Sequence, residues 1–101
     1  PTPVVSNGVV YMGVTSNSSP SEGNYLIALN GADGTQIWKH QLKYYMGAQL
    51  LLFNGSIYTG TEEGKIYALQ ADTGSEIWQS GTGNAFTDGF GSGINAFTIA
   101  P

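Results

Sequence analysis

His40 is the only histidine in the sequence, and the chain has no cysteine that could act as a nucleophile. A catalytic histidine, or one that binds a metal ion, needs a nucleophile, a carboxylate or a second ligand close to it. The neighbours Lys39 and Gln41 offer none of these, and no serine or aspartate is patterned around this position. We therefore predict a solvated His40 at an outer edge of the fold and no catalytic residue in this chain.

The acidic residues stand where the chain is expected to turn. Asp33 directly precedes Gly34, and Asp72 stands two residues before Gly74. Such side chains commonly accept hydrogen bonds from nearby backbone N–H groups. A calcium loop needs alternating carboxylates that end in a glutamate, and residues 30–34 supply too few. The sequence therefore predicts turns at these positions and no metal site.

The run from Gly89 to Gly93 has glycines at alternate positions, like some phosphate-binding loops. Such loops bind phosphate because a helix follows them and its first N–H groups point at the ligand. No helical pattern follows this run. We interpret residues 81–101 as a glycine-rich connection between structural units, leading into the start of a next or ring-closing strand.

The overall charge excludes several classes of partner. Three Lys and Arg residues stand against seven Asp and Glu residues, which gives a net charge of −4. Nucleic acids and anionic membrane surfaces bind clustered basic side chains, so we expect neither as a partner. No apolar run approaches the roughly 18 residues that span a bilayer, so we expect no membrane insertion. The absence of cysteine is compatible with export and excludes disulfides.

The elements that would position these side chains are set by an internal repeat. Residues 7–13 match residues 54–60 at an offset of 47, and residues 28–38 match residues 68–78 at an offset of 40. The difference is absorbed by one longer loop in the first unit, at residues 14–23. Surface loops tolerate such insertions, so we interpret the pattern as two copies of one structural unit.

Each unit contains four short segments with strand character, separated by turn residues. Four antiparallel strands in a repeat of 40 to 47 residues are typical of one blade of a β-propeller. We therefore predict an all-β chain with one blade at residues 1–47 and a second at residues 48–80. The expected strands are residues 3–6, 9–12, 25–29 and 35–38 in the first unit, and 49–53, 57–59, 65–69 and 75–78 in the second.

Residues 68–78 resemble the tryptophan-docking repeat of β-propellers of the pyrroloquinoline-quinone (PQQ) type. The segment has Ala68 first, a polar residue two positions on, Thr-Gly at the sixth and seventh positions, and Trp78 at the eleventh. Residues 28–38 fit the pattern more loosely, because Asp33 stands where the family usually has threonine. The resemblance covers nearly all of residues 1–80.

In this family, the tryptophan of one blade lies between its own alanine and the turn glycine of the neighbouring blade. The resemblance therefore implies that Trp38 packs on Ala28 and against Gly74. Trp78 would need a glycine from a blade that this chain does not contain. The residues implied in docking are Ala28, Gly34, Trp38, Ala68, Gly74 and Trp78.

Enzymes of this family hold their cofactor near the propeller axis, where the inner strands and their loops converge. By that resemblance, the side chains best placed to contact a ligand are Tyr44, Tyr45, Phe86 and Phe90. The catalytic Asp, the calcium carboxylates and the adjacent cysteine pair of the quinoprotein alcohol dehydrogenases have no match in this sequence. Related repeats also form non-enzymatic scaffolds, so the fold alone does not determine the function.

We therefore expect a non-catalytic propeller unit that serves as a binding or protein-interaction scaffold without a cofactor, bacterial and exported by family resemblance. The alternative is a fragment of a PQQ-dependent alcohol or sugar dehydrogenase whose catalytic residues lie outside this chain. A third possibility is a structural or engineered fragment with no ligand. At least about three repeats are normally needed for stability. We therefore expect either further blades in a parent chain or self-association of copies into a closed ring.

Overall fold

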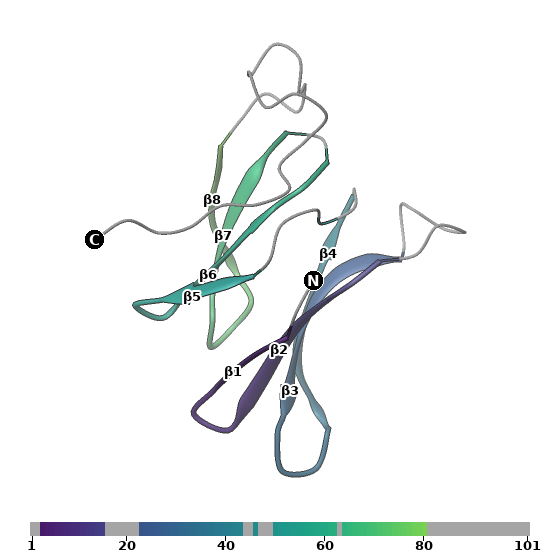
Figure 1. Ribbon diagram of the computed structural model, residues 1–101, viewed down its shortest axis with the longest axis vertical. Coiled ribbons are helices and arrows are strands. Elements are labelled where there is room, and N and C mark those ends of the chain that lie inside the picture. Colours follow the sequence, from purple (N-terminus) through teal and green to yellow (C-terminus); the bar gives the residue numbers. More distant parts are fainter. Residues whose placement is uncertain (1–2, 16–22, 44–45, 47–49, 63, 81–101) are drawn as a thin grey trace.

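The computed structural model describes residues 3–15, 23–43, 46, 50–62 and 64–80. Their strands form two four-stranded antiparallel sheets, so the predicted all-β fold is confirmed. We call these sheets blade 1 and blade 2, and in each the strands are ordered as they follow one another in the chain (Figure 1). Blade 1 contains β1 (Val4–Ser6), β2 (Val9–Val14), β3 (Asn24–Asn30) and β4 (Gln36–Leu42), and blade 2 contains β5 (Leu51–Phe53), β6 (Ser56–Gly60), β7 (Ile66–Gln70) and β8 (Glu76–Ser80).

A two-residue Asn-Gly turn connects the first two strands of each blade. Asn7 and Asn54 have φ angles of 51° and 50°, and the glycines that follow them have φ angles of 76° and 77°. Positive φ at both central positions is the geometry of a type I′ turn, whose twist matches that of the paired strands. The turn fixes the register of the hairpin, so that Ser6 pairs with Val9 in blade 1.

The turns between the last two strands of each blade differ in sequence but make equivalent bonds. In blade 1, the Asp33 carboxylate accepts hydrogen bonds of 3.0 and 2.8 Å from the N–H and hydroxyl groups of Thr35. In blade 2, Thr73 Oγ1 accepts a 3.2 Å bond from the N–H group of Ser75. The prediction that acidic side chains bond the turn backbone is therefore confirmed for Asp33. In blade 2 the bond is made by Thr73, and Asp72 is exposed.

β4 extends beyond the segment expected from the sequence. It was expected to end at Trp38, but it continues to Leu42, which pairs with Asn24 on β3. Both of these residues are buried, so the longer strand covers more of the core. His40 lies between Trp38 and Leu42 on the same face of β4 and is half-buried. β4 is an edge strand of its sheet, so the expected edge position is confirmed, but the side chain is half-buried and not fully solvated as expected.

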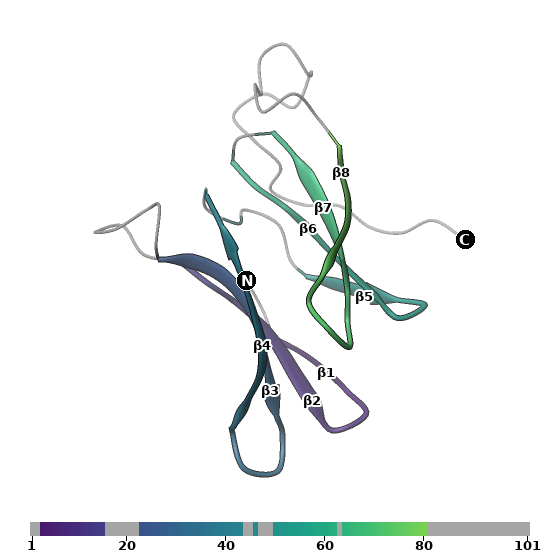
Figure 2. The same cartoon turned by 180° about the vertical axis from the view of Figure 1, so that it is seen from behind.

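The two blades lie side by side and share one apolar core (Figure 2). Four residues paired across blade 1 form a row that faces blade 2, namely Val4, Tyr11, Ala28 and Trp38. The facing row in blade 2 consists of Leu52, Ile57 and Leu69, which pair across β5, β6 and β7. Alternation of side chains along each strand places these rows opposite one another. The buried members of the core are Tyr11, Leu26, Ala28, Trp38, Leu42, Met46, Leu50, Ile57, Tyr67, Leu69 and Ala71.

The chain passes from blade 1 to blade 2 between Leu42 and Leu51. Within this stretch, Met46 is buried and forms an antiparallel bridge with Thr61 of blade 2. The predicted blade boundary between residues 47 and 48 and the predicted connection at residues 81–101 lie outside the described residues. Among the residues that are described, no helix has the length and apolar character needed to cross a membrane.

Candidate functional site

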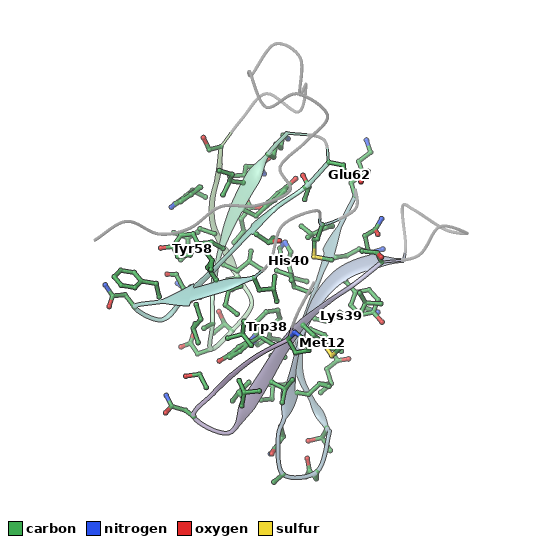
Figure 3. All side chains as sticks on the ribbon, viewed as in Figure 1. Met12, Trp38, Lys39, His40, Tyr58 and Glu62 are labelled. Carbon is green, nitrogen blue, oxygen red and sulfur yellow. The ribbon has the colours of Figure 1, made fainter. Side chains whose placement is uncertain are left out.

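Trp38 joins the two blades through its ring and its one polar group. The residue is 7% exposed and stands on β4 opposite Ala28, whose small side chain leaves room for the indole. Its Nε1–H group donates a 2.8 Å hydrogen bond to the backbone carbonyl of Ala71 in blade 2. The ring also lies against Gly74 of blade 2. Figure 3 places Trp38 between blade 1 and blade 2. A buried indole whose N–H is paired stabilises the seam between the blades without leaving a polar group unsatisfied.

Gly74 meets two structural demands at once. Its φ of 76° lies in the left-handed region, which residues other than Gly, Asn and Asp rarely adopt. A Cβ at this position would also come within 2.5 Å of the Trp38 ring carbons Cδ2 and Cε3. Gly34, its counterpart in blade 1, has φ of 77° but no atom within 4 Å of an ideal Cβ. Of these two glycines, only Gly74 is required both by the backbone conformation of its turn and by contact with an indole ring.

Tyr11 completes the aromatic contact on the blade 1 side of the seam. Its ring centroid lies 6.2 Å from that of Trp38, and the rings are tilted by 43°. This is the range in which tilted aromatic pairs attract each other. Burial raises the pKa of the Tyr11 hydroxyl, and the nearby Asp72 carboxylate raises it further. The hydroxyl therefore keeps its proton to higher pH than that of a free tyrosine.

Blade 2 repeats this arrangement on its other face. Trp78 pairs with Ala68 on β7, and its ring centroid lies 6.0 Å from that of Tyr58 at a tilt of 48°. The geometry within the blade thus matches that around Trp38. Trp78 is nevertheless 44% exposed, and within the described residues no further blade lies against it. The structure therefore brings together Ala28, Trp38 and Gly74 in one contact, and Ala68 and Trp78 in an equivalent but uncovered arrangement.

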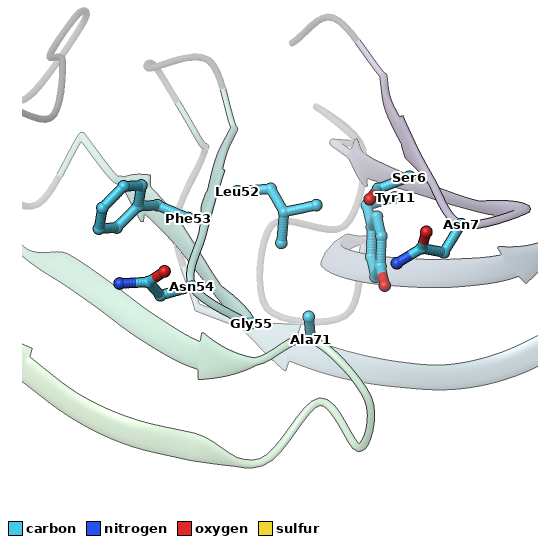
Figure 4. Close-up of a pocket in the computed structure, with 8 residues that line it drawn as sticks. All are labelled: Ser6, Asn7, Tyr11, Leu52, Phe53, Asn54, Gly55 and Ala71. Carbon is cyan, nitrogen blue, oxygen red and sulfur yellow. The ribbon is translucent and has the colours of Figure 1, made fainter.

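An open groove of about 370 Å³ runs along the seam between the blades (Figure 4). The side-chain amides of Asn7 and Asn54 come from the two Asn-Gly turns, one from each blade, and the Tyr11 hydroxyl lies between them. The lining carries hydrogen-bonding groups but no formal charge, and it is formed by Ser6, Asn7, Tyr11, Leu52, Phe53, Asn54, Gly55 and Ala71. An adjoining hollow includes Asp72, which adds a negative charge.

The described residues contain no cluster with the make-up of a metal site, that is, three or more His, Cys, Asp or Glu side chains together. His40 pairs with Leu26 on β3 and lies within the sheet rather than in the groove. The four aromatic residues proposed to contact a ligand lie outside the described part of the chain, so their role stays a prediction: Tyr44, Tyr45, Phe86 and Phe90.

Two features of the seam were missed from the sequence. Tyr11 and Tyr58 recur at the same offset as the Asn-Gly turns, yet they were not linked to the tryptophans. The register across β2 and β3 in blade 1, and across β6 and β7 in blade 2, aligns each tyrosine with the alanine that pairs with the tryptophan. The Ala71 carbonyl was missed because a backbone acceptor has no signature in residue type. A register count from the Asn-Gly turns would have found the tyrosines.

The family comparison agrees with this geometry. The sequence model of a family described as the outer membrane protein assembly factor BamB matches residues 22–89. The chain belongs to this family of PQQ-type propeller repeats. The match begins just before β3 of blade 1 and includes all of blade 2, so both halves of the Trp38 contact lie within it.

Two curated PQQ-type relatives are alcohol dehydrogenases by name. Quinoprotein alcohol dehydrogenase PedH of Pseudomonas putida is 28% identical over 81 residues, covering 76% of this chain and 14% of that protein. The dehydrogenase subunit of the quinone-dependent alcohol dehydrogenase of Gluconobacter oxydans is 31% identical over 88 residues, covering 76% of this chain and 11% of that protein. The chain thus spans only a small part of either relative.

A solved PQQ-type propeller has the same blade arrangement. The crystal structure of BamB from Moraxella catarrhalis superposes with a TM-score of 0.59 at 27% identity, covering 74% of this chain and 21% of that one. The two blades described here are therefore propeller blades.

The groove between the blades does not fit PQQ. This cofactor is a planar polycarboxylate, and a protein site for it must balance the negative charge with basic side chains or a metal ion. No basic residue lines the groove, and Asp72 next to it would repel a carboxylate. The groove is instead suited to neutral groups that exchange hydrogen bonds with amides and a hydroxyl.

Proposed function

We propose that these two blades are a non-catalytic, structural part of a PQQ-type propeller, which serves as a scaffold for protein interaction. The observation that carries this proposal is the Trp38 contact with Ala71 and Gly74. It uses a large aromatic side chain, a paired indole N–H and a specific glycine to hold one blade against the next. Burial of such a side chain stabilises a fold by about 3–5 kcal/mol.

The chemistry of the seam supports a scaffold. Its polar groups are amides, a hydroxyl and backbone groups, and none of them carries a charge at neutral pH. Groups of this kind bind and orient neutral or peptide-like partners, whereas oxidation of an alcohol needs a base and an electron acceptor. A protein surface with exposed backbone and side-chain hydrogen-bonding groups is therefore the partner that the groove suits best.

A second candidate function is supported by the relatives. Both curated relatives described above are named as alcohol dehydrogenases, and each is several times longer than this chain. In this alternative, the two blades are a structural segment of a dehydrogenase, and PQQ together with its ligands lies in blades outside this sequence.

We also infer export to the periplasm or beyond the cell. The matching family is described as an outer membrane protein assembly factor, and a chain without cysteine is compatible with that environment.

A binding experiment tests the scaffold proposal. The chain is titrated with PQQ in the presence of Ca²⁺, and quenching of tryptophan fluorescence is followed. Ethanol oxidation is then assayed with an artificial electron-accepting dye. The scaffold proposal predicts neither saturable quenching nor dye reduction, and saturable binding at micromolar PQQ would contradict it. The gene sequence on either side separates the two candidates further, because calcium carboxylates and a catalytic Asp in adjacent repeats would favour the dehydrogenase.

A further inference from the structure

The groove along the seam and the hollow beside it adjoin each other. Tyr11, Asn54, Gly55 and Ala71 line both of them. The groove has a volume of about 370 Å³ and the hollow one of about 520 Å³. Ligand pockets in proteins commonly have volumes of this order. We call the groove and the hollow together the seam site.

The Tyr11 hydroxyl is a polar group in the seam site that lacks a partner. Its residue is only 7% exposed, and Figure 4 shows the hydroxyl in the groove. Within the described residues this hydroxyl forms no hydrogen bond. Buried hydroxyl groups in folded proteins are normally paired. The position of this hydroxyl therefore indicates a partner from outside the two blades.

Two side-chain amides reach the groove from the Asn-Gly turns. Asn7 and Asn54 are both exposed, and neither amide is bonded to another of the described residues. A side-chain amide offers N–H donors and a carbonyl acceptor, which complement the carbonyl and N–H of a backbone peptide group. Because one amide comes from each blade, the pair can hold an extended peptide at two points.

The hollow adds a negative charge and an apolar side chain. The Asp72 carboxylate is exposed, and no basic side chain among the described residues pairs with it. Burial and, next to it, this charge raise the pKa of the Tyr11 hydroxyl, so the carboxylate lies within electrostatic reach of that group. Ile77 lines the same hollow and is 47% exposed. None of the three basic residues of the chain lines the seam site, so the site favours a cation.

We propose that the seam site binds an extended peptide segment of a partner protein through one arginine side chain. The guanidinium pairs with the Asp72 carboxylate and donates a hydrogen bond to the Tyr11 hydroxyl. The methylene groups of the arginine lie along Ile77, and the amides of Asn7 and Asn54 bond the peptide backbone. This inference rests on the proposed scaffold function and names the chemistry of its partner.

The choice of arginine follows from the two oxygens that the cation has to reach. A guanidinium presents five N–H donors in a planar fork, whereas the ammonium of lysine is a compact point charge. The fork can therefore serve the carboxylate of Asp72 and the hydroxyl of Tyr11 together. The net charge of −4 on the chain also attracts a basic partner and repels an acidic one.

Three variants each remove one group from the seam site. Asp72→Asn removes the charge, and Tyr11→Phe removes the hydroxyl but keeps the ring that packs against Trp38. Asn54→Gly removes an amide and tolerates the positive φ of the turn. Asp33→Asn is the matched control, because it makes the same chemical change at an exposed turn residue that does not line the site.

Binding is followed by NMR on the ¹⁵N-labelled chain, without PQQ, at the indole N–H signals. Trp38 reports on the site because its indole bonds Ala71 and lies beside Tyr11, and Trp78 serves as an internal reference. The probe is the peptide acetyl-Ser-Val-Arg-Val-Ser-amide, whose blocked ends leave arginine as its one charge. A second peptide has glutamine in place of arginine.

Wild type and Asp33→Asn are expected to bind the arginine peptide at least about tenfold more tightly than the glutamine peptide. Asp72→Asn should lose this preference, and Tyr11→Phe should bind the arginine peptide about threefold or more weakly than wild type. Asn54→Gly should weaken the binding of both peptides, because both have the same backbone. Added salt should weaken the binding of the arginine peptide alone.

The proposal would be overturned if the arginine peptide gave no saturable shift of the Trp38 signal at millimolar concentration. Equal affinity of wild type for both peptides would also overturn it, as would an unchanged preference in Asp72→Asn. Unfolding midpoints close to that of wild type establish that the folded variants are being compared. The scaffold proposal is tested separately by the PQQ titration, so either one can fail while the other holds.

Discussion

Trp38 and Trp78 hold the same strand position in successive blades, but within the described residues only the Trp38 ring lies against a following blade. Each tryptophan pairs with an alanine and leans on a tyrosine at about the same distance and tilt. The exposed fraction is 7% for Trp38 and 44% for Trp78. Blade 2 accounts for the lower exposure of Trp38, so a comparison of the two tryptophans isolates the effect of docking.

Replacement of the two tryptophans by alanine should have unequal effects on stability. Trp38→Ala removes a buried indole and its hydrogen bond, and should lower the free energy of unfolding by about 3–5 kcal/mol. Trp78→Ala removes a side chain that is only about half-buried and whose indole forms no hydrogen bond within the described residues, and should lower the free energy of unfolding by less, about 1 kcal/mol. Urea denaturation at a concentration where the chain is single measures both. Equal losses would mean that the Trp38 contact does not hold the blades together.

The two turn glycines should also respond differently to alanine. Both Gly34→Ala and Gly74→Ala force a side chain into positive φ, which costs about 1 kcal/mol. Gly74→Ala also places a methyl group against the Trp38 ring, and overpacking of this kind costs about 1–3 kcal/mol more. Denaturation measures the loss, and near-ultraviolet circular dichroism reports the displaced indole. A larger loss for Gly34→Ala would contradict the packing described here.

Asp33 should make the stability of the chain sensitive to acid. Hydrogen bonds from the N–H and hydroxyl groups of Thr35 hold the pKa of its carboxyl below the ordinary value of 3.8. The resulting stabilisation is present above that ordinary value and is lost as the pH falls through the lower pKa of the folded chain. Asp33→Asn keeps an oxygen acceptor without the charge. Its unfolding midpoint should therefore fall less than that of wild type between about pH 5 and pH 2, and identical acid profiles would count against the bond.

Tyr11 should make the stability sensitive to alkali. Its folded pKa is raised above 10.0 by burial and by Asp72, so the unfolded chain loses this proton first. The stabilisation is present below pH 10.0 and is lost as the pH rises through the folded pKa. Thermal unfolding between about pH 9 and pH 11 should show a smaller loss for Tyr11→Phe than for wild type. Asp72→Asn should move the pKa of Tyr11, read from tyrosinate absorbance, toward its ordinary value. An unchanged pKa would contradict the effect of the Asp72 charge.

The fold could be predicted from the sequence because its turns carry strong local signals. Asn7-Gly8 and Asn54-Gly55 fix the first hairpin of each blade, and the repeat shows that the two blades have the same structure. The extent of β4 could not be predicted, because Lys39 to Gln41 is polar and only pairing with β3 keeps the strand extended. Local composition does not report such pairing.

The seam could be predicted only in part. The residue types of the docking contact are visible in the repeat, but its backbone acceptor at Ala71 is not, since every residue offers the same carbonyl. The groove formed by Asn7, Tyr11 and Asn54 depends on how two blades lie against each other. That relation is a tertiary property, and no spacing within one unit encodes it. His40 illustrates another limit, because its polar neighbours suggested full exposure, whereas its place on the inward face of β4 leaves it half-buried.

The most direct test of this account is hydrogen exchange at the two indole nitrogens, followed by NMR on the ¹⁵N-labelled chain at a concentration where it is single. The Nε1–H proton of Trp38 is bonded to the Ala71 carbonyl and its side chain is 7% exposed, whereas that of Trp78 is 44% exposed. We expect Trp38 to exchange at least about a hundredfold more slowly than Trp78, since its exchange requires the blades to open. Similar, fast exchange at both indoles would contradict the claim that Trp38 joins blade 1 to blade 2.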